Sequence, residues 1–253
     1  MSFLRGVSSA PASLVEKLSA EALYRNIAAR YHVASIDLTV AGTLYKIFRV
    51  SDTNALLETI DPETFSHDER LPYWADLWAS AIVLAEWCIQ SGAVRGKNVL
   101  ELGCGLGLAG IAAARGGAKV VMTDYEEDAL QFARFNALTN VPEFVPTFTL
   151  MDWRAPEHGE RYDFLLGSDI MYEQRHFLPL LDAFHTLLLP GGTVVLTDPD
   201  RAASQSFFAL ARAQGYSVRS SQSSIVYAGR AMSVTRYELR SLSDITTGRT
   251  ERP

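Results

Sequence analysis

KNVLELGCGLGLAG, residues 97–110, joins a short apolar segment to a glycine-rich turn that runs into an apolar helix. Residues without a Cβ atom let the backbone turn sharply and let a ligand lie against the main chain. The N-terminus of the following helix offers unpaired N–H groups to that ligand. The stretch therefore predicts a ligand-binding strand–turn–helix unit, and a tight turn without a ligand is the alternative.

The spacing of the glycines narrows the class of ligand. A dinucleotide-binding turn needs glycine at its first, third and sixth positions, and counting from Gly103 the sixth position is Leu108. This departure disfavours a nicotinamide or flavin dinucleotide. The stretch does fit the pattern E-x-G-x-G-x-G, which begins at Glu101 and places an acidic residue two positions before the first glycine.

Composition sets broad limits on function. The chain has 253 residues, of which 48% are hydrophobic and 21% charged, and its net charge is −6. This balance is typical of a globular protein and argues against nonspecific binding to nucleic acid. Without an apolar run of about 20 residues or a charged-then-apolar leader, we expect a cytoplasmic protein with no membrane partner. Cys88 and Cys104 lack zinc-ligand spacing and the five histidines lie far apart, so we expect no metal site.

Hydrophobic periodicity predicts an α/β domain after an N-terminal extension. In the extension we expect a helix, a β-hairpin and a loop with one short helix, over residues 13–31, 36–50 and 51–70. In the domain we expect five strands that alternate with helices, over residues 99–102, 119–123, 144–151, 162–168 and 193–197. An antiparallel pair, residues 216–224 and 232–240, ends the sheet. The predicted boundaries are 1–70 for the extension, 71–240 for the domain and 241–253 for a frayed tail.

The segment before the glycine strand is rich in aromatic residues. Residues 72–88 read PYWADLWASAIVLAEWC, and the spacing of the apolar positions predicts a single helix. A helix that only packs into the core normally carries fewer tryptophans on one face than the three in this segment. We therefore expect Trp78 or Tyr73 to line a cofactor or substrate pocket, with simple core packing as the alternative.

Acidic and aromatic residues follow three of the predicted strands. Asp124 ends the second strand, where a carboxylate can accept hydrogen bonds from both ribose hydroxyls, and Tyr125 beside it can pack on an adenine face. Asp152 and Trp153 end the third strand, where they can meet an adenine amino group and ring. The alternatives are a helix-capping acid at Asp124 and a plain loop at Asp152.

The fourth strand ends at Ser168 and is followed by Asp169 and Tyr172. Ligands of open parallel sheets bind beyond the carboxyl ends of the strands, near the point where the strand order reverses. Asp169 and Tyr172 are therefore placed for chemistry.

Five motifs together resemble one group of proteins. PYWADLWASAIVLAEW, VLELGCGLGLAGIAAA, TDYEEDAL, LMDW and LLGSDIMYE are similar to motifs of the lysine-methyltransferase-like group of seven-β-strand methyltransferases that use S-adenosylmethionine. This group includes lysine methyltransferases of the electron-transfer-flavoprotein β-subunit and predicted nicotinamide N-methylases. The resemblance covers residues 71–216. It implies a Rossmann-like, seven-stranded, mostly parallel sheet with an antiparallel last strand and helices on both faces.

The resemblance also implies a set of site residues. The positions that match cofactor contacts of the group are Trp78, Glu101, Gly103, Gly105, Asp124, Asp152 and Trp153, and we add Cys104, Tyr125 and Ser168 beside them. Asp169 and Tyr172 match the D-x-x-Y motif that lies at the target lysine in protein-directed members. Ala79 replaces the usual proline of the W-P-S/G segment, and residues 1–70 carry no signature of the group.

The expected function is methyl transfer from S-adenosylmethionine to a lysine of a protein substrate. Asp169 would position the amine and Tyr172 would orient it or form a wall of its pocket. A small-molecule amine, such as a nicotinamide-like acceptor, is the first alternative. A cofactor-binding module without catalytic activity is the second. We expect a monomer.

Overall fold

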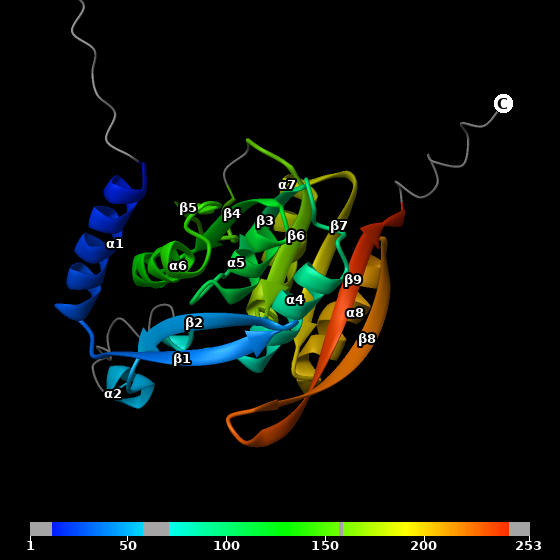
Figure 1. Cartoon of the computed structure of the whole chain (residues 1–253). Helices are drawn as coiled ribbons and strands as arrows, with labels where there is room; N and C mark the ends of the chain where they lie inside the picture. The colour runs from blue at the N-terminus through cyan, green and yellow to red at the C-terminus, as the bar shows by residue number, and fades with distance from the viewer. Residues whose placement is uncertain (1–11, 58–70, 157–158, 243–253) are drawn as a thin grey trace, which may run out of the picture.

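A computed structural model of the chain describes residues 12–57, 71–156 and 159–242. Its centre is a seven-stranded sheet of order β5-β4-β3-β6-β7-β9-β8 (Figure 1). Neighbouring strands from β5 to β7 are parallel, and β9 is antiparallel to both β7 and β8. The strands are β3 (Asn98–Leu102), β4 (Lys119–Asp124), β5 (Thr147–Leu150), β6 (Tyr162–Ser168), β7 (Leu188–Asp198), β8 (Tyr216–Tyr227) and β9 (Arg230–Ser241). The predicted fold class is confirmed.

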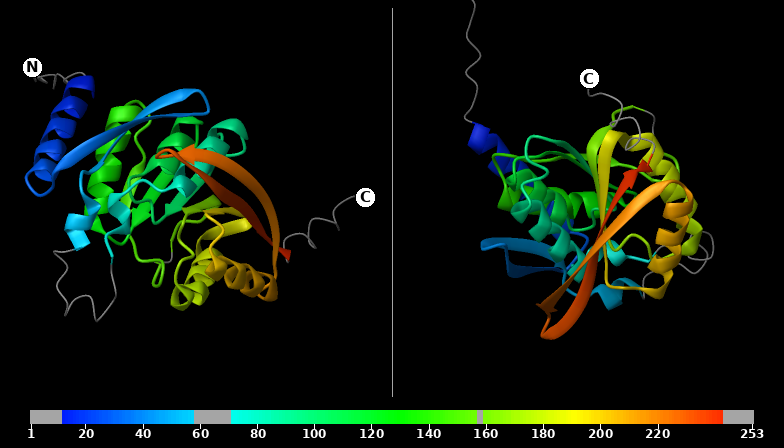
Figure 2. Two further views of the ribbon diagram at one scale, coloured as in Figure 1. Left: turned by 90° about the horizontal axis from the view of Figure 1, so that it is seen from below. Right: turned by 90° about the vertical axis from the view of Figure 1, so that its right-hand side faces the viewer.

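Helices cover both faces of this sheet (Figure 2). One face packs on α4 (Ala79–Gln90), α5 (Leu108–Arg115) and α6 (Glu127–Asn140), and the other on α7 (Phe177–Leu187) and α8 (Ala202–Ala213). The strand order reverses between β3 and β6, since the chain runs from β3 out to β5 and returns to the other side of β3. A crevice at the carboxyl ends of the strands follows from that reversal. None of the described helices is both long and apolar enough to cross a bilayer.

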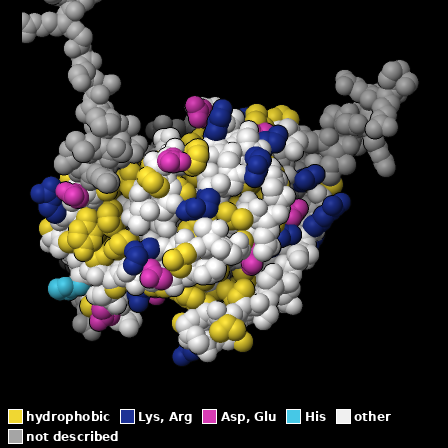
Figure 3. Space-filling view, viewed as in Figure 1, with side chains coloured by type: hydrophobic (Ala, Val, Ile, Leu, Met, Phe, Trp, Pro, Cys, Tyr) yellow, Lys and Arg dark blue, Asp and Glu magenta, His cyan; other side chains and the backbone are white. Residues whose placement is uncertain are grey.

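The N-terminal segment packs on α6. It consists of α1 (Ala12–Ala28), the antiparallel pair β1 (Val33–Val40) and β2 (Thr43–Val50), and the short helix α2 (Thr53–Leu57). Tyr24 of α1 and Phe48 of β2 both contact the ring of Phe135, with centroids 5.3 and 4.8 Å apart. Hydrophobic side chains gather at this end of the molecule in Figure 3. Buried residues of the hairpin and of the domain form one core, so the extension does not have a core of its own among the described residues.

Two asparagines of α6 hold the free edge of β2. The Asn136 side chain accepts from Phe48 N–H (2.7 Å) and donates to Phe48 C=O (3.0 Å). One helical turn later, Asn140 makes the same pair of bonds with Lys46 (2.9 and 2.8 Å). Residues two apart in a strand lie on the same face, and residues four apart in a helix lie on the same side. The spacing of the two asparagines in α6 therefore matches the spacing of their two partners in β2. The asparagines thus satisfy backbone groups that an edge strand would leave open.

The single helix predicted over residues 72–88 is wrong. Tyr73–Ala75 form a 3₁₀ turn, the chain is extended at Asp76 and Trp78, and α4 begins at Ala79. Two local bonds stabilise this break: Leu77 N–H donates to Asp76 Oδ1 (2.9 Å), and Trp78 Nε1 donates to Tyr73 C=O (2.8 Å). The rings of Tyr73 and Trp78 contact each other across this break, with centroids 6.0 Å apart.

Other strand boundaries differ from prediction by a few residues. β5 begins at Thr147 rather than at residue 144, and β7 begins at Leu188 rather than at residue 193. Pro190-Gly191-Gly192 forms an irregularity within β7, where the register shifts between Tyr162 and Phe164 of the neighbouring strand. The predicted tail, apart from residues 241 and 242, lies outside the described residues.

We predict that Asn136→Ala lowers the free energy of unfolding by about 3 kcal/mol, because it strips partners from Phe48 and from the buried C=O of Leu106. Urea unfolding followed by circular dichroism measures this loss. Asn140→Ala is the matched control, since its bonds to β2 are exposed and should contribute less than about 1 kcal/mol. Equal losses in the two variants would contradict the prediction.

Candidate functional site

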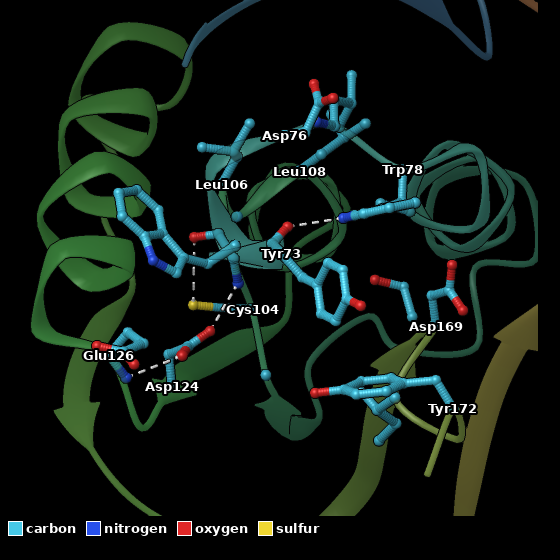
Figure 4. Close-up of a pocket in the computed structure, with 18 of the residues that line it drawn as sticks. Tyr73, Asp76, Trp78, Cys104, Leu106, Leu108, Asp124, Glu126, Asp169 and Tyr172 are labelled. Carbon is cyan, nitrogen blue, oxygen red and sulfur yellow. Dashed lines mark hydrogen bonds between the residues drawn. The ribbon is translucent and has the colours of Figure 1, made fainter. Parts of the chain in front are cut away.

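A hollow of about 190 Å³ opens at the carboxyl ends of β3, β4, β6 and β7 (Figure 4). In that view, Asp124 and Glu126 lie on one side with the glycine turn, and Asp169 and Tyr172 lie on the other. Its lining includes ten of the twelve predicted site residues: Trp78, Gly103, Cys104, Gly105, Asp124, Tyr125, Trp153, Ser168, Asp169 and Tyr172. The remaining two, Glu101 and Asp152, lie outside this lining.

The glycine turn is built from left-handed backbone. Gly103 and Gly105 have φ values of 62° and 51°, and Gly107, with φ 88°, is the N-cap of α5. At Gly103 a Cβ atom would come within 3.0 Å of the Trp153 ring. The turn thus needs glycine both for its dihedral angles and for the close approach of neighbouring groups. Its backbone forms one wall of the hollow.

Asp124, the last residue of β4, connects the glycine turn to this neighbouring strand by a hydrogen bond. Its Oδ2 accepts from Gly105 N–H (2.9 Å), and its Oδ1 accepts from Glu126 N–H (3.0 Å) at the start of α6. Burial raises the pKa of its carboxyl group to about 6. Asp124 therefore combines the two alternatives left open by the sequence: it lies on the pocket wall and it also stabilises the beginning of the following helix.

Glu101 lies behind the turn, only 1% exposed. Its Oε2 accepts from Gly110 N–H (2.9 Å) in the first turn of α5, while Oε1 has no hydrogen-bond partner among the described residues. A Cβ atom at Gly110 would overlap this carboxylate and Met122, so only glycine fits there. Glu101 is placed to support the turn from behind, and its predicted cofactor contact stays a prediction.

A second hollow adjoins the first beside Tyr125 and Trp153. The two rings meet edge to face, with centroids 6.4 Å apart. The buried Trp153 Nε1 lacks a hydrogen-bond partner in the described part of the chain. Asp152 lines this second hollow, and both of its carboxylate oxygens accept from Arg154. The residues predicted to surround an adenine are therefore close together, with the Asp152 carboxylate already paired.

Asp169 and Tyr172 form the opposite side of the hollow, together with the aromatic residues of the segment before α4. Asp169 has the left-handed φ of 56°, unusual for a residue with a side chain, and its N–H donates to Thr197 C=O (2.8 Å). The ring of Tyr73 contacts both Tyr172 and Trp78, with centroids 5.5 and 6.0 Å apart. Burial raises the pKa of Tyr172 to about 12, so its hydroxyl is protonated at neutral pH. Trp78 and Tyr73 both line the hollow, and their predicted contact with a cofactor or substrate stays a prediction.

Comparison with known proteins identifies the family. Residues 66–214 match the family described as lysine methyltransferase. The chain belongs to this family. The resemblance inferred from the five motifs is confirmed.

The curated relatives are longer than their matched region. Protein N-lysine methyltransferase METTL21A of Xenopus tropicalis is 34% identical over 134 residues, 51% of this chain and 62% of that protein. The electron transfer flavoprotein beta subunit lysine methyltransferase of Danio rerio is 31% identical over 138 residues, 52% of this chain and 51% of that protein. The matched region therefore spans between half and two thirds of each relative's length.

A solved structure shares the fold. The crystal structure of the SAM-dependent methyltransferase from Agrobacterium tumefaciens has a TM-score of 0.55 and 21% identity, over 82% of this chain and 70% of that chain. At this level of sequence identity, the match is evidence for the fold alone.

Arg201 also lines the hollow of this lysine methyltransferase family member, and it was not among the residues predicted from the sequence. It follows β7, and its guanidinium makes two bonds to the Asp169 carboxylate, from Nε to Oδ1 (2.8 Å) and from Nη2 to Oδ2 (2.9 Å). Its position just after a parallel strand, in the segment Asp198-Pro199-Asp200-Arg201, is the signal that could have found it. The neighbouring strand β6 brings Asp169 to the same edge.

We predict that Glu101→Gln removes a pH dependence of stability. Burial raises the pKa of Glu101 from about 4.5 to about 8. Between these values the unfolded chain has lost the proton and the folded chain still holds it, so wild-type stability falls as the pH rises. Because glutamine cannot ionise, the Tm of the variant should gain on the wild-type Tm from pH 5 to pH 8. A constant difference in scanning calorimetry of the ligand-free proteins would contradict this.

Proposed function

We propose that this protein transfers the methyl group of S-adenosylmethionine to a lysine side chain of a protein substrate. The observation that carries the proposal is the convergence of two residue sets on one hollow, in a chain of the lysine methyltransferase family. The glycine turn with Asp124 is suited to the cofactor. Asp169 and Tyr172, across the hollow, are suited to an amine.

The residues present fit S-adenosylmethionine. The turn at Gly103 and Gly105 offers a wall without side chains, as a ligand lying against the backbone requires. Asp124 faces the hollow with a carboxylate suited to two ribose hydroxyls. Tyr125 and Trp153 offer ring surfaces for the adenine. When bound, the cofactor supplies a methyl group on a positively charged sulfur.

Protonation of the acceptor is the main chemical obstacle. A lysine amine with a pKa near 10.4 is protonated at pH 7, and removing the proton costs about 4.6 kcal/mol. The aromatic walls formed by Tyr73, Trp78 and Tyr172 partly remove the amine from water, which favours its neutral form. Asp169 orients the nitrogen toward the methyl group. Water accepts the proton.

The acceptor side of the hollow suits a long apolar stem. Trp78 is held by its hydrogen bond to Tyr73 C=O and is 38% exposed, so the aromatic rings reach from the surface to Asp169. The four methylene groups of lysine can pack between such rings while the amine reaches the carboxylate. This shape supports a side chain that enters from a larger partner. The monomeric state, the cytoplasmic location and the lack of a nucleic-acid partner remain predictions from the sequence.

We predict opposite effects of two aspartate substitutions. Asp124→Ala should weaken binding of S-adenosylmethionine about tenfold to a hundredfold in titration calorimetry, because the ribose hydroxyls lose charge-assisted hydrogen bonds. Asp169→Ala should abolish methyl transfer and leave the cofactor affinity within about twofold of wild type, since Asp169 lies across the hollow from the glycine turn. Full activity of Asp169→Ala would disprove the role given to this residue.

We also predict that the purified chain, incubated with a cell lysate and S-adenosylmethionine tritiated in its methyl group, places label in a protein band. Acid hydrolysis and amino-acid analysis should then recover the label as methyllysine. Asp169→Ala serves as the control and should give no labelled band. Label found only in the low-molecular-weight filtrate would overturn the protein substrate. A lack of S-adenosylmethionine binding in calorimetry would overturn the proposed methyltransferase activity altogether.

A further inference from the structure

The Asp169–Arg201 pair has the geometry of a fixed ion pair. Two hydrogen bonds join the groups, and both carboxylate oxygens take part. The Asp169 side chain is 6% exposed and that of Arg201 39%, so the carboxylate is buried and the guanidinium covers it from the solvent side. Bidentate pairing fixes the plane of a carboxylate as well as its position.

The backbone of Arg201 is held in place next to β7. Its N–H donates to Asp198 Oδ1 (2.7 Å), and its C=O accepts from the hydroxyl of Ser204 (2.7 Å) in the first turn of α8. Asp198 itself is buried at the end of the strand. The guanidinium therefore extends toward Asp169 from a fixed starting point.

The preceding residue joins this loop to the terminal hairpin. Asp200 has a left-handed φ of 58°, and its carboxylate accepts from Thr235 Oγ1 (2.6 Å), Ser233 Oγ (3.0 Å) and Gln222 Nε2 (3.0 Å). Three donors on β8 and β9 thus hold the loop between β7 and α8. Arg201 is held from the strand, the helix and the hairpin.

The charges that face the hollow are unbalanced without Arg201. Among the described lining residues Arg201 is the one cationic side chain, whereas the acidic lining residues come from the segment before α4 (Asp76), from the end of β4 (Asp124, Glu126) and from the end of β6 (Asp169). Tyr73 and Tyr172 add phenols, and Asp198 lies behind the pair. Without the guanidinium, the Asp169 carboxylate would hold an entering amine as its ammonium ion, which is the form that cannot react.

We propose that Arg201 is a positioning residue for methyl transfer, whose guanidinium orients the Asp169 carboxylate and cancels its charge so that the lysine amine reacts in its neutral form. The inference rests on the proposed function. The ammonium ion first loses a proton to water, and the nitrogen lone pair then forms the N–C bond. The electron pair of the breaking C–S bond goes to sulfur, which leaves a methylated ammonium ion and a neutral thioether.

The first test is the pH dependence of the Arg201→Gln variant. Initial rates of tritium transfer into lysate protein are measured from pH 6.5 to 10 at saturating cofactor. Loss of the guanidinium should raise the pKa of the bound amine by about one unit, so the rate at pH 7.5 should fall about tenfold. The difference in rate between the variant and the wild type should shrink above the pH at which the wild-type rate levels off. Arg201→Lys keeps a positive charge and should retain most of the rate at pH 7.5.

The second test measures binding of a permanent cation. n-Butyltrimethylammonium has the shape of a lysine side-chain end and cannot lose a proton. In calorimetry with S-adenosylhomocysteine present, it should bind Arg201→Gln about tenfold more tightly than wild type, because Asp169 is left uncompensated. A loss of structure would weaken this binding rather than strengthen it. Thermal melts of each variant identify unfolding directly.

Arg30→Gln is the matched control. Arg30 makes a comparable bidentate pair with Asp128, and neither residue lines the hollow. This variant should keep the wild-type pH profile and cation affinity. An equal loss of rate at every pH in Arg201→Gln, together with unchanged or weaker cation binding, would overturn the role of Arg201 and leave the proposed function standing. A wild-type chain that places no label in protein would overturn both.

Discussion

Two buried acidic side chains hold the glycine turn, and the rest of the site is arranged around them. Glu101 on β3 accepts from Gly110 N–H and Asp124 on β4 accepts from Gly105 N–H, each at 2.9 Å. The two bonds come from neighbouring parallel strands, so the pairing of β3 with β4 sets the position of the turn. Burial of both acids opposes their ionisation, and the backbone N–H donors offset part of that cost.

The N-terminal hairpin is connected to the same turn through one side chain. Asn136 Nδ2 donates to Leu106 C=O (2.9 Å) within the turn and also to Phe48 C=O (3.0 Å) in β2. A single buried amide therefore satisfies backbone groups of both segments, which lie far apart in the sequence. The hairpin is thus part of the support of the site, although it lines neither of its two hollows.

The parts of the molecule that follow local rules could be predicted from the sequence. The alternation of apolar runs with helical segments indicated the sheet, and the acids at Asp124 and Asp169 could be placed because parallel strands end at one edge. The break before α4 is held by two side-chain–backbone hydrogen bonds within residues 73–78, which apolar spacing does not record, so helical periodicity across residues 72–88 was misleading. The position of Arg201 just after β7 could have placed it at the same edge, but its pairing with Asp169 joins two different strands, and no spacing within the sequence records that pairing.

The two sides of the hollow consequently depend on different kinds of contact. The side with the glycine turn and Asp124 is built by β3, β4 and the loops directly after them. The side with Asp169 needs three distant segments: the break at Tyr73, the end of β6 and the loop at Arg201, which β8 and β9 hold through Asp200. The terminal hairpin can therefore affect the acceptor side while the turn keeps its shape. Besides covering the edge of the sheet, the hairpin is thus connected through Asp200 and the next residue, Arg201, to the carboxylate of Asp169.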